Sequence, residues 1–281
     1  MQSASKAIPI HRWKKGELQE LDDMVSVEEP LEIRLAFYSQ SSKERHQVSV
    51  TMRTPGHDED LAIGFLFTEN LIPSFELVES IQRLDPGFRR SQRDNIIQVN
   101  LKPGYQPDIA LLSRHFYTTS SCGVCGKTSI DLVQSLVETR IAPPLLQIKA
   151  PVIAGLPEKL EDVQKEFAST GAIHAAALFD HRGEFIALRE DVGRHNALDK
   201  LIGHCLRENL LPLDQHLLLL SGRASFELLQ KASMAGIQVV AAVGAPSSLA
   251  VQLAEDAGIT LLGFVKRERI NIYTHPHRIS E

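Results

Sequence analysis

The sequence predicts an α/β protein whose regular core lies in its C-terminal half. Two observations lead to this class: short apolar runs alternate with segments of helical period, and small-residue turns separate them. We expect buried strands over 217–220, 238–243 and 259–265, with helices over 224–235 and 247–257 between them. Strands that alternate with helices in this way usually form a parallel sheet through right-handed crossovers.

A smaller, β-containing part is expected before this core. Residues 31–37 and 48–52 alternate apolar and polar side chains, which predicts two strands joined by a hairpin loop over 39–45. A buried helix is expected to begin near Asp58, where three acidic residues precede a long apolar run. His57 before it is read either as an exposed helix-start residue or as a residue that lines a site. A short strand is expected over 96–101.

Proline marks the least regular segments. Residues 1–30 are polar, contain Pro9 and Pro30, and are expected to form a mobile start and a short arm. Residues 141–157 contain Pro-Pro and Gly-Leu-Pro, so we place the division between an N-terminal part, 1–145, and a C-terminal domain, 146–281, in this segment. Beyond it the pattern predicts a helix that ends at Gly171, strands over 172–179 and 184–188, and a helix with Cys205 on its apolar side as an inert core thiol.

Composition excludes several classes of function. The net charge of −5 gives no general basic field for nucleic acid. No apolar run reaches the roughly 18 residues of a membrane span, and Met1 to Trp13 lacks the features of a signal peptide. Three cysteines fit a reducing compartment better than a disulfide framework, so we expect a cytoplasmic protein.

The most reactive stretch is a loop around Cys122 and Cys125, which are separated by two residues and flanked by glycines. Structural zinc needs about four ligands, and His115, His174 or His195 would have to complete such a site. A dithiol–disulfide couple usually begins a helix directly after a strand, which is not the setting here.

A third use of the pair is a nucleophilic thiolate that carries a group such as sulfur. Lys127 and a helix expected to begin at Thr128 both favour the thiolate over the thiol. A loop whose cysteines merely persist in a reducing cell is the plain alternative. The residues alone leave all four uses open.

Three further clusters are suited to phosphate or to a substrate. The strand-to-helix junctions Ser221-Gly222-Arg223 and 244–248 fall where open α/β sheets bind ligands, although ordinary capped turns explain them equally well. The stretch 190–196 is either a substrate grip or a turn with a helix cap. The stretch 264–269 is a local cationic patch or a solvated tail.

Together these segments resemble the formate dehydrogenase accessory sulfurtransferase family, over about 53–275. The stretches that carry the resemblance occur in one order: Arg53-Thr54-Pro55-Gly56-His57-Asp58, Ser121-Cys122-Gly123-Val124-Cys125-Gly126, Thr170-Gly171-Ala172-Ile173-His174, Glu190-Asp191-Val192-Gly193-Arg194-His195-Asn196-Ala197-Leu198-Asp199-Lys200, Ser221-Gly222-Arg223 and Ala245-Pro246-Ser247.

The resemblance implies a cytidine-deaminase-like α/β/α core with an added N-terminal part, in a homodimer. It implies that sulfur passes from a cysteine desulfurase to the molybdenum of a bis(molybdopterin guanine dinucleotide) cofactor, which activates formate dehydrogenase. Cys122 falls on the persulfide position, with Cys125 as the second thiol. The cofactor-binding segment, for the guanine nucleotide, falls on Phe264, Val265, Lys266, Arg267, Glu268 and Arg269, with Ser221, Gly222 and Arg223 as further candidates.

Deaminase chemistry is not expected from this fold. That chemistry needs His-x-Glu and Pro-Cys-x-x-Cys around zinc, whereas His174 is followed by two alanines and Ser121 precedes Cys122. We therefore expect no zinc. Two rival functions remain: a protein that binds the molybdenum cofactor and inserts it without covalent sulfur, and a thiol oxidoreductase with a reversible disulfide.

Overall fold

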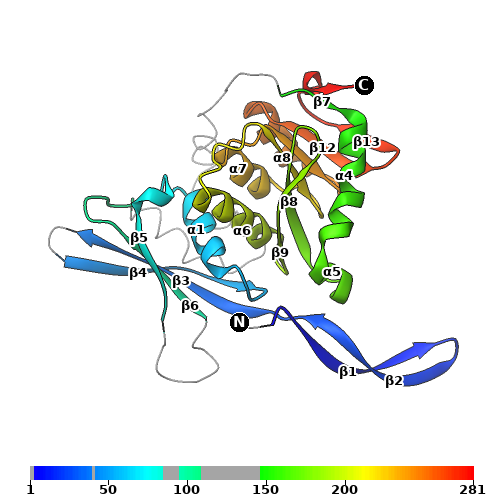
Figure 1. The fold of residues 1–281 in the computed structure, drawn as a ribbon, viewed down its shortest axis with the longest axis horizontal. Coiled ribbons are helices and arrows are strands. Elements are labelled where there is room, and N and C mark those ends of the chain that lie inside the picture. The colour runs from blue at the N-terminus through cyan, green and yellow to red at the C-terminus, as the bar shows by residue number, and fades with distance from the viewer. Residues whose placement is uncertain (1–2, 40–41, 85–94, 109–145) are drawn as a thin grey trace.

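The computed structural model describes residues 3–39, 42–84, 95–108 and 146–281. Within these residues the chain forms an α/β unit from its C-terminal half and a smaller β-rich part from its N-terminal half (Figure 1). The cysteine loop, with Cys122 and Cys125, and the helix predicted from Thr128 lie outside the described residues. The predicted division at residue 145 stays a prediction.

The centre of the C-terminal unit is a six-stranded sheet in the order β13-β12-β11-β10-β8-β9. The strands β10, β11 and β12 are parallel, while β8 and β13 run antiparallel to their neighbours. The bounds are β8 His174–Asp180, β9 Phe185–Asp191, β10 His216–Leu220, β11 Val239–Ala242, β12 Thr260–Lys266 and β13 Arg269–Ile272. The predicted parallel βαβαβ arrangement is confirmed.

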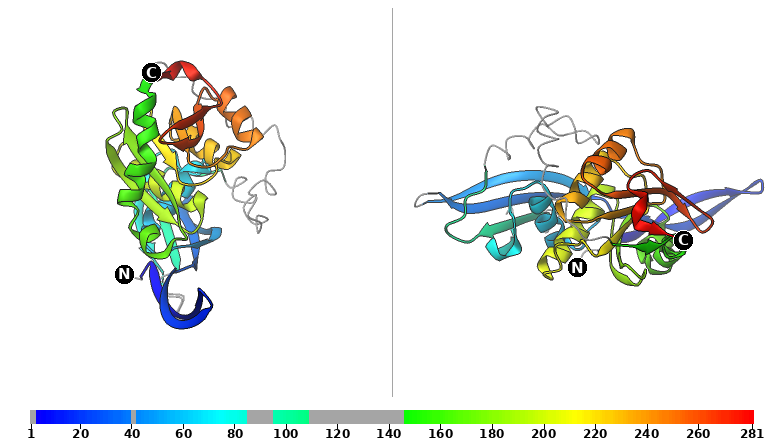
Figure 2. Two further views of the ribbon diagram at one scale, coloured as in Figure 1. Left: turned by 90° about the vertical axis from the view of Figure 1, so that its right-hand side faces the viewer. Right: turned by 90° about the horizontal axis from the view of Figure 1, so that it is seen from above.

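Helices cover both faces of this sheet (Figure 2). On one face lie α6 (Arg194–Arg207), α7 (Phe226–Met234) and α8 (Ser248–Asp256), and on the other lies α4 (Ala150–Val163). Alternate residues of each strand enter the two cores: Leu218 and Val240 face α6 to α8, whereas Leu217 and Val239 face α4. This period-two pattern confirms the predicted α/β/α core.

The N-terminal part is a four-stranded sheet in the order β4-β3-β6-β5. Its strands are β3 (Glu29–Ser39), β4 (Ser42–Arg53), β5 (Val78–Arg83), which follows a 3-10 turn at Phe75–Leu77, and β6 (Ile96–Leu101). Helix α1 (Asp58–Thr68) lies between this sheet and α6. It is buried on nearly every side, as its apolar sequence predicted, and one hydrophobic core extends from β3 through α1 to α6.

Two glycines allow α1 and α6 to touch backbone to backbone. A Cβ atom added to Gly64 would overlap the carbonyl group of Asp199, and one added to Gly203 would overlap that of Asp60. Because no side chain separates the helices at this crossing, the N-terminal sheet is held close to the C-terminal unit.

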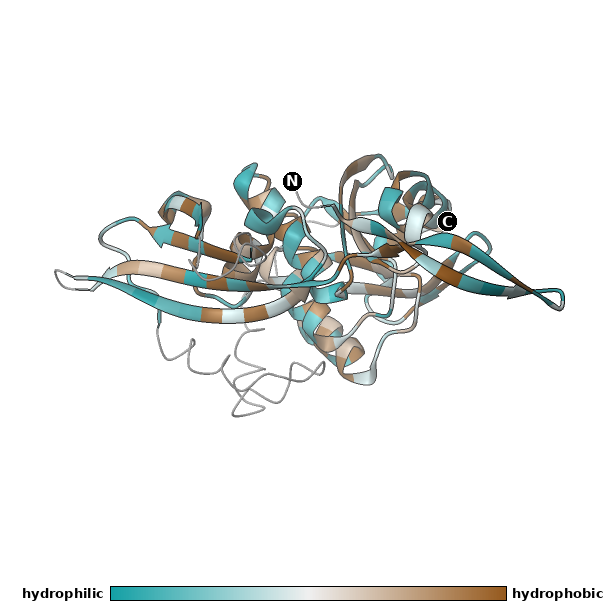
Figure 3. Cartoon of the chain, turned by 90° about the horizontal axis from the view of Figure 1, so that it is seen from below, coloured by the Kyte–Doolittle hydropathy of each residue, from teal (hydrophilic) through white to brown (hydrophobic). Residues whose placement is uncertain are grey.

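The expectation of an irregular segment over 1–30 is wrong. Strands β1 (Ser5–Lys14) and β2 (Glu17–Ser26) form an antiparallel ribbon that projects from the body (Figure 1). Lys15 and Gly16 both have positive φ, which matches the turn type that joins twisted two-stranded ribbons. The ribbon carries hydrophilic and hydrophobic residues on exposed faces (Figure 3), so its sequence shows no alternation between buried and exposed positions.

The expectation of a turn at Gly155-Leu156-Pro157 is also wrong, because α4 occupies these residues. Pro157 lies inside the helix, where its missing N–H group normally favours a break. Burial of Ile153, Leu156 and Leu160 on one face maintains the helix. Helix α5 (Lys165–Thr170) is capped by Gly171, whose φ is 65°. The short strands β7 (Ile148–Lys149) and β14 (Ile279–Ser280) pair in parallel, and a 3-10 turn at Pro276–Arg278 precedes β14.

Candidate functional site

The loops after β10 and β11 lie beside the C-terminal part of β12 at the carboxyl edge of the sheet. The N–H group of Gly244 donates to the carbonyl of Gly222 at 3.0 Å, and the N–H group of Phe264 donates to the carbonyl of Gly244 at 3.1 Å. The structure thus brings Ser221-Gly222-Arg223 next to 244–247 and to the first residue of the predicted cofactor segment. These loops continue the hydrogen bonding of the parallel strands beyond their ends.

Glycines are required where these loops approach one another. A Cβ atom at Gly244 would lie 3.0 Å from the backbone nitrogen of Arg223, and one at Gly263 would lie 2.9 Å from Pro246 Cδ. Such distances are shorter than ordinary contacts, so larger residues would separate the loops. The edge is therefore a tightly fixed backbone surface, on which Ser247 caps α8 by accepting from Ala250 at 3.2 Å.

Phe264 has an unusual backbone at the point where β12 meets this edge. Its φ is 51°, a region that residues with a side chain rarely adopt, and the pairing of β12 with β13 shifts register here. The half-buried ring packs under the Arg269 guanidinium, whose carbon lies 5.2 Å from the ring centre. Local strain of this kind is often concentrated at functional sites.

The other residues of the predicted cofactor segment diverge from this point. Val265 is fully buried in the core on the α4 side. Lys266, at the end of β12, and Arg267 and Glu268, in the turn before β13, are exposed. Arg267 lies 3.7 Å from Glu158 of α4, so it faces away from the loops after β10 and β11. The structure therefore brings Phe264 and Arg269 together, without gathering the whole segment at one point.

Two histidines lie at the same edge. His174 begins β8, which is antiparallel, so its ring is next to the end of β10: a Cβ atom at Gly222 would lie 3.2 Å from its Nδ1. Burial, the Arg194 guanidinium and the His195 ring lower the pKa of His174, and Asp191 opposes them. His195 Nε2 lies 2.7 Å from Glu227 Oε2 and 3.3 Å from Ser225 Oγ. The Glu227 carboxylate thus fixes the orientation of the His195 ring.

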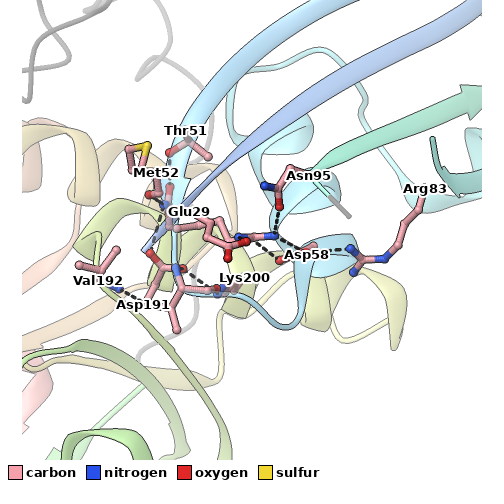
Figure 4. A network of polar contacts seen from close by, with 12 residues as sticks. Glu29, Thr51, Met52, Asp58, Arg83, Asn95, Asp191, Val192 and Lys200 are labelled. Atoms are coloured by element: carbon pink, nitrogen blue, oxygen red, sulfur yellow. Dashed lines mark hydrogen bonds and ion pairs between the residues drawn. The ribbon is translucent and has the colours of Figure 1, made fainter. Parts of the chain in front are cut away.

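The stretch 190–196 contributes both to this edge and to the interior. Asp191 is completely buried, where Lys200 Nζ lies 2.6 Å from its Oδ2 (Figure 4). It accepts hydrogen bonds from Thr54 N and Gly193 N. Asn196 bridges Asp191 and the carbonyl of Met52. Gly193 is the N-cap of α6. The stretch 190–196 therefore combines a structural turn with residues that lie at the carboxyl edge of the sheet.

The stretch 53–58 belongs to the same buried network (Figure 4). Arg53 is fully buried and donates to both carboxylate oxygens of Asp58, at 2.9 and 3.1 Å. Arg83 reaches Asp58 from β5 at 3.0 Å. His57 is exposed at the start of α1. Two segments more than 130 residues apart are thereby joined, and the turn before α6 is fixed against the N-terminal sheet.

The sequence analysis identified neither the contact of Glu227 with His195 nor the position of the His174 ring beside Gly222. Glu227 is a single carboxylate in the first turn of α7, and no local pattern connects it to His195. His174 was considered only as a zinc ligand. Within the described ranges no three metal-binding side chains gather, and no helix there is long and apolar enough to cross a membrane.

Comparison with known proteins places this arrangement in a family. A model of the FdhD/NarQ family matches residues 27–280. A sulfur carrier protein FdhD of Streptomyces avermitilis is 46% identical over 275 residues, 96% of this chain and 94% of the relative. One from Mycolicibacterium paratuberculosis is 49% identical over 254 residues, 90% of each chain.

A solved structure supports the fold. The crystal structure of a formate dehydrogenase accessory protein from Desulfotalea psychrophila aligns with a TM-score of 0.72 at 22% identity, over 99% of this chain and all of that one. At this identity the likeness concerns the fold alone. The extent of the family match and the identity to its members show that this chain belongs to the FdhD/NarQ family.

Proposed function

We propose that this protein is a sulfur carrier that takes persulfide sulfur from a cysteine desulfurase and transfers it to the molybdenum cofactor of formate dehydrogenase. The observation that carries the proposal is its identity of 46–49% to relatives named sulfur carrier proteins, over at least 90% of the chain. The Cys-x-x-Cys pair at 122 and 125 supplies the chemistry that such a role requires. On this proposal the protein is a sulfurtransferase that acts in the cytoplasm.

The first step is an exchange of sulfur between two thiols. The Cys122 thiolate attacks the outer sulfur of the persulfide on the donor, forming Cys122–S–SH and releasing the donor's thiolate. In the second step the Cys125 thiolate attacks Sγ of Cys122, which forms a disulfide and expels hydrosulfide. The two cysteine sulfurs are oxidised as the carried sulfur is reduced to sulfide, and a cellular dithiol then restores the pair.

The acceptor is the bis(molybdopterin guanine dinucleotide) cofactor, bound as a substrate. The carboxyl edge supports this choice, since small-residue loops and helix N-termini are suited to phosphate oxygens. The strained Phe264 and its Arg269 partner offer an aromatic face and a cation beside that edge. Sulfide is a soft ligand that suits the metal.

Intact-mass analysis tests the covalent step. The wild-type protein, incubated with a cysteine desulfurase and cysteine, should gain sulfur, and Cys122→Ala should not. Cys205→Ala is the matched control, because Cys205 is buried and should not contribute. The proposal fails if the wild type gains no sulfur or if Cys122→Ala gains as much. Cys125→Ala should load sulfur and release it slowly.

A non-covalent chaperone for the cofactor is the second candidate. It is favoured by the exposed side chains of Lys266 and Arg267, whose charges suit the phosphates of a cofactor without any covalent step. In that case Cys122→Ala would still activate formate dehydrogenase, whereas charge reversal at Lys266, Arg267 and Arg269 would abolish activation. We also propose a homodimer, which light scattering of the purified chain tests directly.

A further inference from the structure

Arg278 is a buried cation at the amino edge of the six-stranded sheet, where β10, β11 and β12 begin. It ends the 3-10 turn before β14, and only 9% of the residue is exposed. Its Nη1 donates to Thr260 Oγ1 at 3.1 Å, at the first residue of β12. Thr260 Oγ1 in turn donates to the carbonyl of His275, and β14 pairs with β7. These contacts on both sides of Arg278 fix the position of its guanidinium.

Among the residues that the structure describes, no carboxylate pairs with this guanidinium. Burial lowers the pKa of Arg278, and no acidic group opposes the effect. Glu255, which contacts the same segment of chain, lies 3.8 Å from His275 instead. Arg278 Nε is buried and has no hydrogen-bond partner. A buried charge and a buried N–H group without an acceptor are both unfavourable, so an anionic oxygen would supply what this side chain lacks.

The N-terminus of α4 lies at the same end of the sheet and also lacks a negative group. Figure 1 shows β7, the start of α4 and the C-terminus together at this end. The N-cap of this 14-residue helix is the exposed Lys149, which makes no capping hydrogen bond, and the first turn contains no acidic residue. A cation at the positive end of a helix is unfavourable, where serine or aspartate is usual. An anion at this N-terminus would neutralise both charges.

Packing places the Arg278 guanidinium on the face of the sheet that α4 covers. Thr260, which it contacts, precedes Leu262 by two residues, so both side chains lie on the same face of β12. Leu262 belongs to the hydrophobic core that includes Ile153, near the start of α4. Strand β14, directly after Arg278, pairs with β7, directly before α4. Arg278 and the first turn of α4 therefore border the same corner of the protein.

We propose that Arg278, Lys149 and the N-terminus of α4 bind a tetrahedral oxyanion at the amino edge of the sheet. Phosphate and sulfate suit this set of groups, because a guanidinium and the free N–H groups of a helix N-terminus both donate to their oxygens. The oxyanion is a free ion or the phosphate group of a small metabolite. The site goes beyond the proposed function, since it lies at the opposite edge from the candidate functional site and requires neither Cys122 nor Cys125.

Isothermal titration with inorganic phosphate, sulfate and acetate, at constant ionic strength, tests the site. Phosphate and sulfate should bind the wild type more tightly than acetate does. Arg278→Gln should weaken phosphate binding by about ten- to a hundredfold, the range expected for a lost charge-assisted hydrogen bond, and Arg278→Lys should recover part of the loss. The matched control is Arg45→Gln, at an exposed side chain of β4, which should bind phosphate as the wild type does.

A phosphomonoester distinguishes the two sources of the oxyanion. If glycerol phosphate binds more tightly than inorganic phosphate and depends equally on Arg278, the ligand is the phosphate group of a larger molecule. If it binds no more tightly, the ligand is the free ion.

Thermal unfolding separates a ligand site from an arginine that only supports the fold. In buffer without oxyanions, Arg278→Met should unfold at the temperature of the wild type or above it, because the variant lacks the unpaired buried charge. Phosphate at roughly a hundred times its dissociation constant should raise the midpoint of the wild type by about 5 °C. It should leave the midpoint of Arg278→Met unchanged.

Three results would overturn the proposal. The wild type might bind none of the three oxyanion probes, Arg278→Gln could bind phosphate as tightly as the wild type, or phosphate could stabilise Arg278→Met as much as the wild type. Should the Arg278 variants fail to fold, Lys149→Gln decides, at an exposed side chain: phosphate affinity equal to that of the wild type rejects the site. Sulfur loading of Cys122 is measured separately, so failure here leaves the proposed function unaffected.

Discussion

Lys200 Nζ lies 2.6 Å from Asp191 Oδ2, and both side chains are buried where the N-terminal sheet meets the C-terminal unit. Lys200 also donates to the carbonyl of Thr54 at 2.8 Å. The pair thus connects the segment before α1 to the turn that precedes α6, which begins with Arg194 and His195. Stability and the geometry of the candidate site depend on the same contact.

Removing one member of this pair should destabilise the protein strongly. Lys200→Met leaves the Asp191 carboxylate buried without its cation, a change that typically costs about 3–5 kcal/mol. Urea unfolding measures the loss. Arg12→Met, which removes the exposed pair with Asp23, is the control and should cost less than about 1 kcal/mol. Equal losses in the two variants would contradict the role assigned to the buried pair.

The close crossing of α1 and α6 predicts that replacing glycine by alanine lowers stability at Gly64, whereas the same change at Gly155, away from the crossing, does not. Gly64→Ala forces the helices apart and should cost about 1–3 kcal/mol or more, as overpacked cores do. Gly155→Ala, in α4, meets no atom within 4 Å and should be neutral or stabilising by up to about 1 kcal/mol. Chemical denaturation compares them directly, and a harmless Gly64→Ala would refute the close crossing.

Acid should weaken the contact between α1 and the C-terminal unit through Asp60. Burial alone would raise the pKa of this carboxyl, but His57, Arg189 and Arg207 lower it well below its ordinary value. The arginines lie at 2.8 and 2.6 Å. Because the folded-state pKa is depressed, the stabilisation is present above the unfolded pKa of about 4 and is lost as pH falls below it.

Asp60→Asn tests this dependence. The variant should be about 3–5 kcal/mol less stable than the wild type at pH 7, and the difference should shrink as pH falls below about 4. Unfolding in urea between pH 3 and 7 measures both curves. The exposed Asp162→Asn serves as the control, with an expected change below about 0.5 kcal/mol at pH 7. A constant difference across the range would exclude the ionised carboxylate as the source.

Cys205 should stay unreactive in the folded protein. Burial raises its pKa to about 12, so at pH 8 only about one molecule in 10⁴ holds the thiolate. Iodoacetamide at pH 8 should therefore modify the native chain at no more than two of its three cysteines, and modify all three after denaturation. Peptide mapping identifies the sites, and rapid labelling of native Cys205 would contradict its burial.

The sequence was most informative where burial produced a simple period. Strands β10, β11 and β12 were predicted within two residues, because continuous apolar runs lie between turn residues. The β1–β2 ribbon was missed because Trp13 and Leu18 are 71% and 67% exposed, so no buried face marks it. The first part of helix α4, up to Pro157, was missed because this proline predicts a break that packing on the far face overrides.

The sequence predicted which segments form the candidate site, but it did not predict how these segments contact one another. The stretches 190–196 and 221–223 were identified by their residue types, but the sequence gives no indication that His174 lies against Gly222. Glu227 meets His195 only because α6 and α7 follow parallel strands. Such pairings arise from topology over 30 residues or more, for which local periodicity carries no signal.

Two substitutions at Phe264 separate the effect of backbone strain on stability from the effect of losing the packed ring. At φ of 51° alanine remains strained and glycine does not, so Phe264→Gly should be more stable than Phe264→Ala by about 1 kcal/mol. Both variants lose the ring that packs under Arg269, so the difference between them isolates the backbone. If the ring also stacks on a nucleotide base, both variants should bind guanosine more weakly than the wild type, by a similar factor. If the two variants are equally stable in urea, the backbone at residue 264 relaxes after substitution. If both variants bind guanosine as tightly as the wild type, Phe264 is not part of the site.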